Sequence, residues 1–193
     1  HGRNNWKKII AKKDFDKVVF IGDYFDTHEG YKGVSPQQQK ESFKNIITFK
    51  KANKSKVVLL LGNHDFHYLR TTDDEPYSGF QWRERKDIQK LLHSALDKNL
   101  MQMCYTYKNV LFTHAGVTKT WCRANRVDVK NIERSINDLF KCKPNSFRFT
   151  MGNNFSQNGD DVTQSPIWVR PMSLCSDSVN NYIQVVGHTV VRR

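Results

Sequence analysis

One segment of this chain reads Val57-Val58-Leu59-Leu60-Leu61-Gly62-Asn63-His64-Asp65, and its character changes at Gly62. The apolar run before Gly62 is short and begins with β-branched residues, which is typical of a strand buried on both faces of a sheet. Directly after it the chain presents an amide, an imidazole and a carboxylate. In parallel sheets, functional groups gather at the carboxyl ends of the strands. This segment therefore predicts an α/β fold with a functional site where this strand ends.

Three further segments repeat the pattern of an apolar run followed by polar residues. They are Val18-Val19-Phe20-Ile21 before Gly22-Asp23-Tyr24-Phe25-Asp26, Val110-Leu111-Phe112 before Thr113-His114-Ala115-Gly116, and Ile183-Gln184-Val185-Val186 before Gly187-His188-Thr189. One such motif would be weak support for a site, but four in succession are strong. We expect four strands to present a possible metal ligand each at the same end.

Helical periodicity predicts the elements between these strands. Ser35-Pro36-Gln37-Gln38 is a strong helix start, with Ser as cap, Pro at the first position and Gln at the third. Met101 to Tyr107 is expected to be an edge strand, and residues 143–165 a polar surface excursion. Apolar stripes at helical spacing predict four helices, marked by Trp6, Ile9 and Ile10; by Phe43, Ile46 and Ile47; by Ile88, Leu91, Leu92, Ala95 and Leu96; and by Val129, Ile132, Ile136, Leu139 and Phe140.

Composition narrows the class of protein. The 193 residues are 38% hydrophobic, and no apolar run approaches the roughly 20 residues of a membrane span, so we expect no membrane partner. No signal peptide is visible, and four scattered cysteines without a C-x-x-C pair indicate reduced thiols, so we expect a cytoplasmic protein. The net charge of +12 favours polyanionic partners, although a solvated basic surface explains it equally well.

The motifs GDxxD, GNHD, THAG and GHT, in this order, resemble the signature of calcineurin-like metallophosphoesterases over nearly the whole chain. The last two are most similar to the branch that holds serine/threonine protein phosphatases and diadenosine tetraphosphatases. The resemblance implies an α/β fold of two packed mixed β-sheets, a β-sandwich flanked by α-helices. We expect one metallophosphoesterase domain over residues 1–193.

The family's first motif, D-x-H-G, is only half present, as His1-Gly2. We therefore expect residues to be missing before His1, among them an Asp two places upstream. The alternative is a first metal site that lacks one ligand. Family members usually continue beyond the position of Arg193, so residues missing after Arg193 are a further interpretation of the sequence.

The resemblance implies two divalent metal ions that share a hydroxide, which attacks phosphorus directly. Nitrogen and oxygen ligands suit Mn, Fe, Zn or Ni, and the sequence does not choose among them. By match to the motifs, the first metal takes His1, Asp23 and the upstream Asp. The second metal takes Asp23, Asn63, His114 and His188.

The same match implies the catalytic roles. His64 is expected to be the general acid that protonates the leaving oxygen, and Asp65 to orient its imidazole and raise its pKa. Asp26 is expected to be structural, holding its loop or a histidine. We expect Asn63 and Arg170 to contact the phosphate; Arg170 ends Trp168-Val169-Arg170, which is similar to an L-W-x-R segment of the tetraphosphatase-like branch. The alternative for Arg170 is an ordinary surface position.

Two segments leave alternatives open. The aromatic loop from Phe66 to Trp82 either stacks a nucleobase or forms a small core of its own. Cys142 to Arg148 fits the C-x5-R loop of cysteine-dependent phosphatases, but Pro144 removes a backbone N–H that such a loop needs. We interpret that match as chance.

The leading hypothesis is a dinuclear metal-dependent hydrolase of a phosphate ester or nucleotide polyphosphate. Thr27-His28 stands where protein phosphatases carry an Arg, which favours a phosphorylated small molecule or a nucleotide as substrate over a phosphoprotein. Nucleic acid is a further possible substrate, because the chain is basic. The competing hypothesis is a non-catalytic scaffold on the same fold, which the missing Asp alone supports. The sequence does not indicate an oligomeric state.

Overall fold

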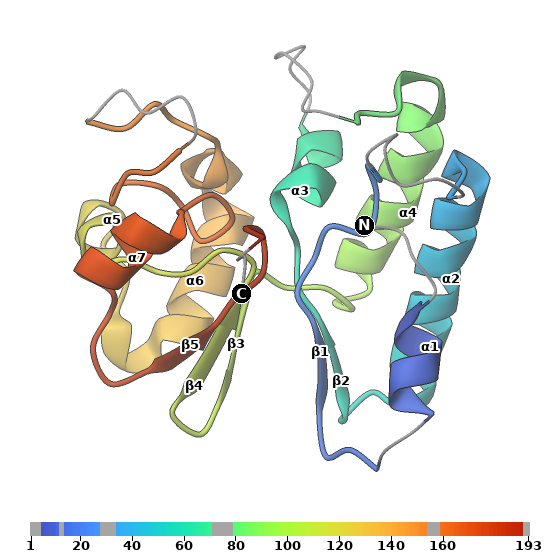
Figure 1. Ribbon diagram of the computed structural model, residues 1–193, viewed down its shortest axis with the longest axis horizontal. Coiled ribbons are helices and arrows are strands. Elements are labelled where there is room, and N and C mark those ends of the chain that lie inside the picture. Colours follow the sequence, from blue (N-terminus) through green and yellow to red (C-terminus); the bar gives the residue numbers. More distant parts are fainter. Residues whose placement is uncertain (1–4, 12–13, 28–33, 71–78, 154–158, 191–193) are drawn as a thin grey trace. The chain divides into compact units, whose positions relative to one another are not determined.

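The computed structural model describes residues 5–11, 14–27, 34–70, 79–153 and 159–190 (Figure 1). They divide into two compact units, His1–Met101 and Gln102–Arg193, each of which is treated below by itself. The expectation of one domain over residues 1–193 stays a prediction beside this division.

Unit 1 is built on two parallel strands, β1 (Val18–Phe20) and β2 (Val57–Leu59), paired in the register Val18 to Val57 and Phe20 to Leu59. Every side chain from Val57 to Leu61 is buried, so the predicted strand with two covered faces is confirmed. The helices of this unit are α1 (Asn5–Ile10), α2 (Pro36–Ala52), α3 (Asn63–Leu69), the short 3-10 helix η1 (Trp82–Glu84) and α4 (Arg85–Asp97).

Helix α2 begins where the sequence predicts. The Ser35 side chain accepts the backbone N–H of Gln38, and the Gln38 side chain accepts the N–H of Ser35, which completes a capping box ahead of Pro36. The helix buries Phe43 and Ile46. Helix α4 buries Ile88, Leu92 and Ala95, three members of its predicted stripe, and it lies beside α2 and α3 (Figure 1).

Helix α1 forms as predicted, but none of its residues is fully buried, and Trp6 and Ile10 are half-buried. The Trp6 ring packs at 5.5 Å from Phe20 and 5.4 Å from Phe49, measured between ring centroids. Ile9, by contrast, is 70% exposed. The predicted apolar stripe of this helix was therefore wrong at Ile9.

Aromatic rings form the centre of unit 1 under the loop that follows β1. Tyr24 and Phe25 pack on Phe43 of α2, with ring centroids 5.0 and 5.2 Å apart. Phe80 stacks on the buried Tyr68 ring at 4.4 Å and an interplanar angle of 17°. The described part of the aromatic loop is thus a small core, as one of the two sequence interpretations holds; Tyr77 lies outside the described residues.

Unit 2 contains a mixed sheet in the order β3-β4-β5, from β3 (Cys104–Tyr107), β4 (Val110–Thr113) and β5 (Ile183–Val185). β3 and β4 are antiparallel and joined by a turn at Lys108 and Asn109, and β3 is the edge strand that the sequence indicates. β4 and β5 are parallel. The helices are α5 (Lys119–Ala124), η2 (Val129–Asn131), α6 (Ile132–Cys142), η3 (Pro144–Phe147) and α7 (Pro171–Asp177).

Helix α6 packs on β3 and on η3. Its Glu133 accepts the backbone N–H and the hydroxyl of Thr106, while Ile132 and Ile136 are buried. The expected surface excursion over residues 143–165 was wrong in part. Phe147 is fully buried because the Trp121 and Phe140 rings pack on it, and Asp161 and Ser165 are buried as well.

Two expectations from composition can be compared with the structure. All four cysteines lie in the described residues and are free thiols. Of the helices in the described ranges, none combines the length and the apolar character needed to cross a bilayer.

Candidate active site

Two loops that follow the parallel strands of unit 1 touch each other through glycines. Gly22 follows β1 at φ +91°, and a Cβ there would lie 2.3 Å from the backbone nitrogen of Gly62, which follows β2. A Cβ on Gly62 would lie 2.2 Å from the Oδ1 atom of Asp23. Only glycines allow this approach. It brings the Asp23 carboxylate against the start of α3.

Asp65 holds these two loops together. Its carboxylate accepts the backbone N–H groups of Asp23 at 2.7 Å, Tyr24 at 2.8 Å and Gly62 at 3.0 Å. Asp65 is the third residue of α3, so the bond from Gly62 closes the reciprocal half of a capping arrangement. The side chain is fully buried. The Asp65 carboxylate therefore binds three backbone N–H groups, and these hydrogen bonds fix the position of Asp23.

The imidazole of His64 is oriented by Asp26. Its Nδ1 atom lies 3.0 Å from the Asp26 Oδ2 atom, and its backbone N–H donates to the Asp23 carboxylate at 3.1 Å. Asp26 Oδ1 accepts the hydroxyl of the buried Tyr68 and, at 3.4 Å, the side-chain amide of Gln81. The Tyr68 oxygen in turn accepts the backbone N–H of Gln81 at 2.8 Å.

This network shifts the pKa values of its members. Burial opposes the charged form of His64, yet the hydrogen bond to Asp26 and the charges of Asp23, Asp26 and Asp65 leave its pKa raised. Burial raises the pKa of Asp26, while hydrogen bonds from His64 and Tyr68 act against that shift. Burial also raises the pKa of Tyr68, so its hydroxyl stays protonated and donates a hydrogen bond to Asp26. His64 thus gains the property that a general acid near neutral pH requires.

The expectation for Asp65 divides into two parts. Its charge does raise the pKa of His64. The hydrogen bond that turns the ring, however, goes to Asp26, the residue for which a structural or histidine-holding role is expected. The catalytic assignment of His64 itself stays a prediction.

Unit 2 brings a second group of predicted residues together. His114 follows β4 and His188 follows β5, and because these strands are parallel, both rings come to the same end of the sheet. Their centroids lie 5.1 Å apart at an angle of 67°. The N–H of Gly187 donates to the His114 carbonyl at 2.8 Å, and His188 has a φ of +64°. Positive φ in a non-glycine residue is a conformation that functional sites often retain.

Arg170 lies in the same group. Its Nη1 atom donates to the Thr189 hydroxyl at 3.1 Å, next to His188 in the chain. Trp168 packs its ring on His188, with centroids 5.7 Å apart. Arg170 is half-buried, and burial lowers its pKa although the Asp160 charge acts in the other direction. The guanidinium of an Arg stays protonated in proteins, so its planar, charged group remains suited to a phosphate.

The predicted site residues therefore form two groups, one in each unit. Asp23, Asn63, His64 and Asp65 lie together in unit 1, and His114, His188 and Arg170 lie together in unit 2. His1 and His28 are outside the described residues. No cluster of three or more His, Cys, Asp or Glu side chains suited to a metal ion occurs within the described residues.

Each group by itself contains donors of the kinds that divalent metal ions take in proteins. Asp23 and Asn63 are 7% and 2% exposed, so an oxygen-bearing carboxylate and amide are held out of bulk water. The His114 and His188 rings add imidazole nitrogens. Carboxylate, amide and imidazole donors are those that Mn, Fe, Zn and Ni take in proteins.

Sequence patterns did not indicate the residues that support the His64–Asp26 pair. Tyr68 lies four positions after His64 on α3, a spacing at which two helical side chains share a face. This spacing is the sequence pattern from which Tyr68 could have been predicted. Gln81 and Gln39 join the network through their side chains, with Gln81 Nε2 donating to Gln39 Oε1 at 2.9 Å. No local pattern marks either glutamine.

An α/β fold whose strand ends carry a buried carboxylate and amide, a His–Asp pair and two adjacent imidazoles belongs to the class of metal-dependent phosphoester hydrolases. The chain is a member of the calcineurin-like phosphoesterase family, whose sequence model matches residues 3–192. The predicted family and its α/β fold, here with two small sheets and several helices, are thereby confirmed. Comparisons with curated proteins and with solved structures found no match.

Proposed function

We propose that this protein hydrolyses a phosphate ester or a nucleotide polyphosphate at a dinuclear metal centre, with His64 as the general acid. The observation that carries the proposal is the bonding of His64, whose backbone N–H holds the Asp23 carboxylate while its ring meets buried Asp26. His64, the predicted proton donor, is thus bonded directly to Asp23, a predicted metal ligand.

The proposed ligands are those that the four motifs imply: Asp23, Asn63, His114 and His188 for the second metal, and His1, Asp23 and the Asp expected upstream for the first. Divalent ions in such a set supply Lewis-acid activation of the phosphate and of the attacking water. We keep Mn, Fe, Zn and Ni as the candidates, because the donors are nitrogen and oxygen.

The chain's own residues do the remaining work in this proposal. Asp26 holds the His64 Nδ1 atom, which leaves the Nε2 atom to give its proton to the leaving oxygen. Asp65 keeps the Asp23 loop in position through three backbone N–H groups. Arg170 and Asn63 bind the phosphate oxygens, and the charge of Arg170 compensates charge that builds up on them.

The proposed substrate class is a phosphorylated small molecule or a nucleotide. Thr27 stands where the protein phosphatases of this family carry a phosphate-gripping Arg, so a phosphoprotein fits the chain less well. The net charge of +12 keeps nucleic acid as a second candidate. A cytoplasmic location stays our expectation.

A non-catalytic scaffold is the second candidate function. A binding module gains nothing from a histidine whose pKa is raised beside a buried carboxylate, so this pair supports an enzyme.

The test is hydrolysis by the complete protein with Mn²⁺ or Ni²⁺, using p-nitrophenyl phosphate, bis-p-nitrophenyl phosphate and diadenosine tetraphosphate. We expect turnover of the monoester or the dinucleotide, and a loss of about 10²–10⁴-fold in kcat on His64→Asn. Turnover of the diester alone would support a nuclease. No turnover of any of these substrates with either metal would leave the scaffold.

A further inference from the structure

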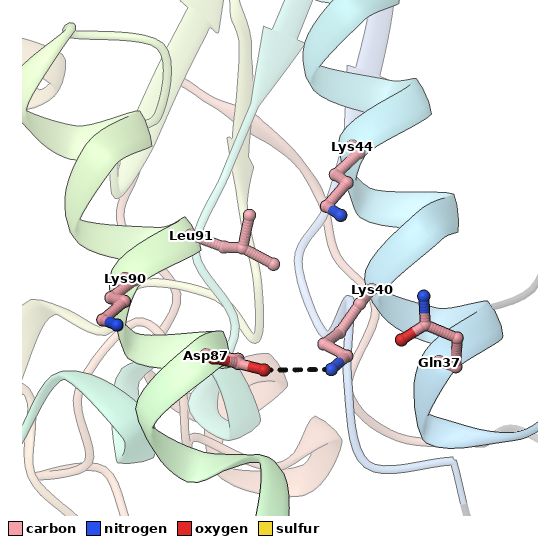
Figure 2. A pocket seen from close by; sticks show the side chains of 6 residues that line it. All are labelled: Gln37, Lys40, Lys44, Asp87, Lys90 and Leu91. Atoms are coloured by element: carbon pink, nitrogen blue, oxygen red, sulfur yellow. Dashed lines mark hydrogen bonds and ion pairs between the residues drawn. The ribbon is translucent and has the colours of Figure 1, made fainter.

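A groove runs between helices α2 and α4 of unit 1. None of the residues that line it is a predicted site residue. It consists of two adjoining hollows of about 320 and 240 Å³, which share Lys44 and Leu91 as lining residues. Figure 2 shows the first hollow, where Lys40 and Lys44 of α2 face Asp87 and Leu91 of α4, and Lys90 of α4 also lines it. We call the two hollows together the lysine groove.

The floor of the lysine groove is apolar. Leu91 lies where the two hollows meet and is half-buried, and Ile47 of α2 is also half-buried. Phe43 and Ala95 close the floor beneath them and are buried. Water is in contact with the aliphatic side chains of Leu91 and Ile47, which a partner's apolar side chains would cover favourably.

The rim of the groove is positively charged. Lysines of α2 line both hollows, Lys90 of α4 lines the first and Lys98, directly after α4, the second. Asp87 is the only acidic residue among the described residues that line them. Lys40 is already neutralised, because its Nζ atom lies 2.6 Å from Glu84 and 3.2 Å from Asp87. The exposed lysines of the rim are Lys44, Lys51, Lys90 and Lys98.

We propose that the lysine groove binds an acidic, amphipathic helical segment of a partner protein. An apolar floor between two basic rims matches a helix with Leu or Ile along one face and Asp or Glu along its flanks. The groove follows α2 from Gln37 to Lys51, a rise of about 21 Å, which corresponds to about four turns of such a helix. The charges also steer an acidic partner toward the groove.

A nucleic acid fits the same surface less well. Single strands bind by stacking bases on exposed aromatic faces, and the aromatic ring lining the groove, Phe43, is fully buried. Arginine, which grips phosphates with two parallel hydrogen bonds, is absent from the described residues that line the hollows. The aliphatic floor has no role in binding a phosphate backbone.

The test uses a fluorescent synthetic peptide of about 15 residues with Leu at helical i, i+3, i+4, i+7 spacing and Glu on both flanks. Its binding to the complete protein is measured by anisotropy against a scrambled peptide of the same composition. A single-stranded oligothymidine of similar length serves as competitor. We compare wild type with Lys44→Glu/Lys90→Glu, which reverses charge on both rims, and with Leu91→Ala.

The matched control is Lys54→Glu/Lys86→Glu, since both lysines are exposed, line neither hollow and change the net charge by the same amount. We expect the amphipathic peptide to bind more tightly than the scrambled one, at least tenfold weaker binding for Lys44→Glu/Lys90→Glu and for Leu91→Ala, and less than a twofold change for the control. Thermal unfolding checks that each variant is folded.

Equal binding of the two peptides, or equal loss in the control pair, would overturn the proposal. So would oligothymidine that displaces the peptide and binds more tightly than it does, because the groove would then be a nucleic-acid surface. None of these outcomes depends on phosphatase activity, so the proposal stands or falls apart from the proposed function.

Discussion

The imidazole of His64 lies 3.0 Å from the carboxylate of Asp26, a residue 38 positions earlier in the chain and completely buried. Because Asp26 also accepts bonds from Tyr68 and Gln81, its carboxylate has a fixed orientation when it meets the ring. A histidine held in this way keeps one nitrogen bonded to the protein and offers the other to a substrate.

Replacing Asp26 by Asn should impair the proposed proton transfer without removing a metal ligand. The hydrogen bond and the charge of Asp26 both raise the pKa of His64, so the variant should have a lower His64 pKa. The acid form is then lost at lower pH, and the alkaline limb of the kcat profile should move to lower pH. We expect kcat at pH 8 to fall by about 10- to 100-fold, less than the roughly 10²–10⁴-fold that loss of the general acid itself would cause. An unchanged profile with unchanged metal content would contradict the role.

Tyr68→Phe should cost stability more than catalysis. The hydroxyl donates to Asp26 and accepts the N–H of Gln81, and the ring is fully buried, so the change leaves buried polar groups without their partner. We expect a loss of about 1–3 kcal/mol in the free energy of unfolding, measured in urea. Tyr105→Phe, at a partly exposed position on β3, is the control. Equal stability of wild type and Tyr68→Phe would show that the hydroxyl is dispensable.

The strands and their polar ends were predictable because both signals are local. A run such as Val57 to Leu61 must be buried, and the residues directly after it must lie at the strand's end. The role of Asp65 was harder to predict. Its neighbour in sequence is His64, but both are in the first turn of α3, where side chains at i and i+1 do not face each other. Their proximity along the chain therefore suggested a side-chain contact between Asp65 and His64, but the helix points the two side chains in different directions.

Contacts between distant parts of the chain could not be predicted from any local pattern. Asp26 reaches His64 and Gln39 reaches Gln81 across 38 and 42 positions, and no periodicity links such residues. The polar composition of residues 143–165 likewise gave no indication that Phe147 is buried, because its burial depends on the Trp121 and Phe140 rings. One buried ring in a polar segment carries too little hydrophobic signal to be read as core.

Asp65→Asn separates the two roles considered for this residue. The carboxylate accepts three backbone N–H groups, and an amide in its place would direct its own N–H₂ at one or more of them. We expect the free energy of unfolding to fall by at least about 3 kcal/mol, because hydrogen bonds to a charged group contribute about 1.5–3 kcal/mol each. A variant with normal stability whose only defect is a shifted pH profile would instead favour an orienting role.

Stability should decline as the pH falls from about 6.5 to about 4. Burial, aided by the Arg70 charge, lowers the pKa of His67 to about 4, while an unfolded His has a pKa near 6.5. Between these values the unfolded chain takes up a proton that the folded chain does not, so acid favours unfolding. The free energy of unfolding in urea, measured from pH 7 to 4, should have a shallower slope for His67→Gln. Equal slopes for His67→Gln and the wild type would refute the assignment.

The assignment of Asp23 as the ligand shared by two ions can be separated from that of His114, a ligand of one. If a carboxylate bridges two ions, its loss should affect both, whereas loss of an imidazole should affect one. Elemental analysis after loading with Mn²⁺ should find about two ions per chain in the wild type, about one in His114→Ala and less than one in Asp23→Asn. His93→Ala is the control, as an exposed histidine outside every motif. Treatment with EDTA should abolish hydrolysis by the wild type, and Mn²⁺ should restore it. Equal metal content in Asp23→Asn and His114→Ala would rule out the bridge, and wild-type content in both would refute the ligand set that the four motifs imply.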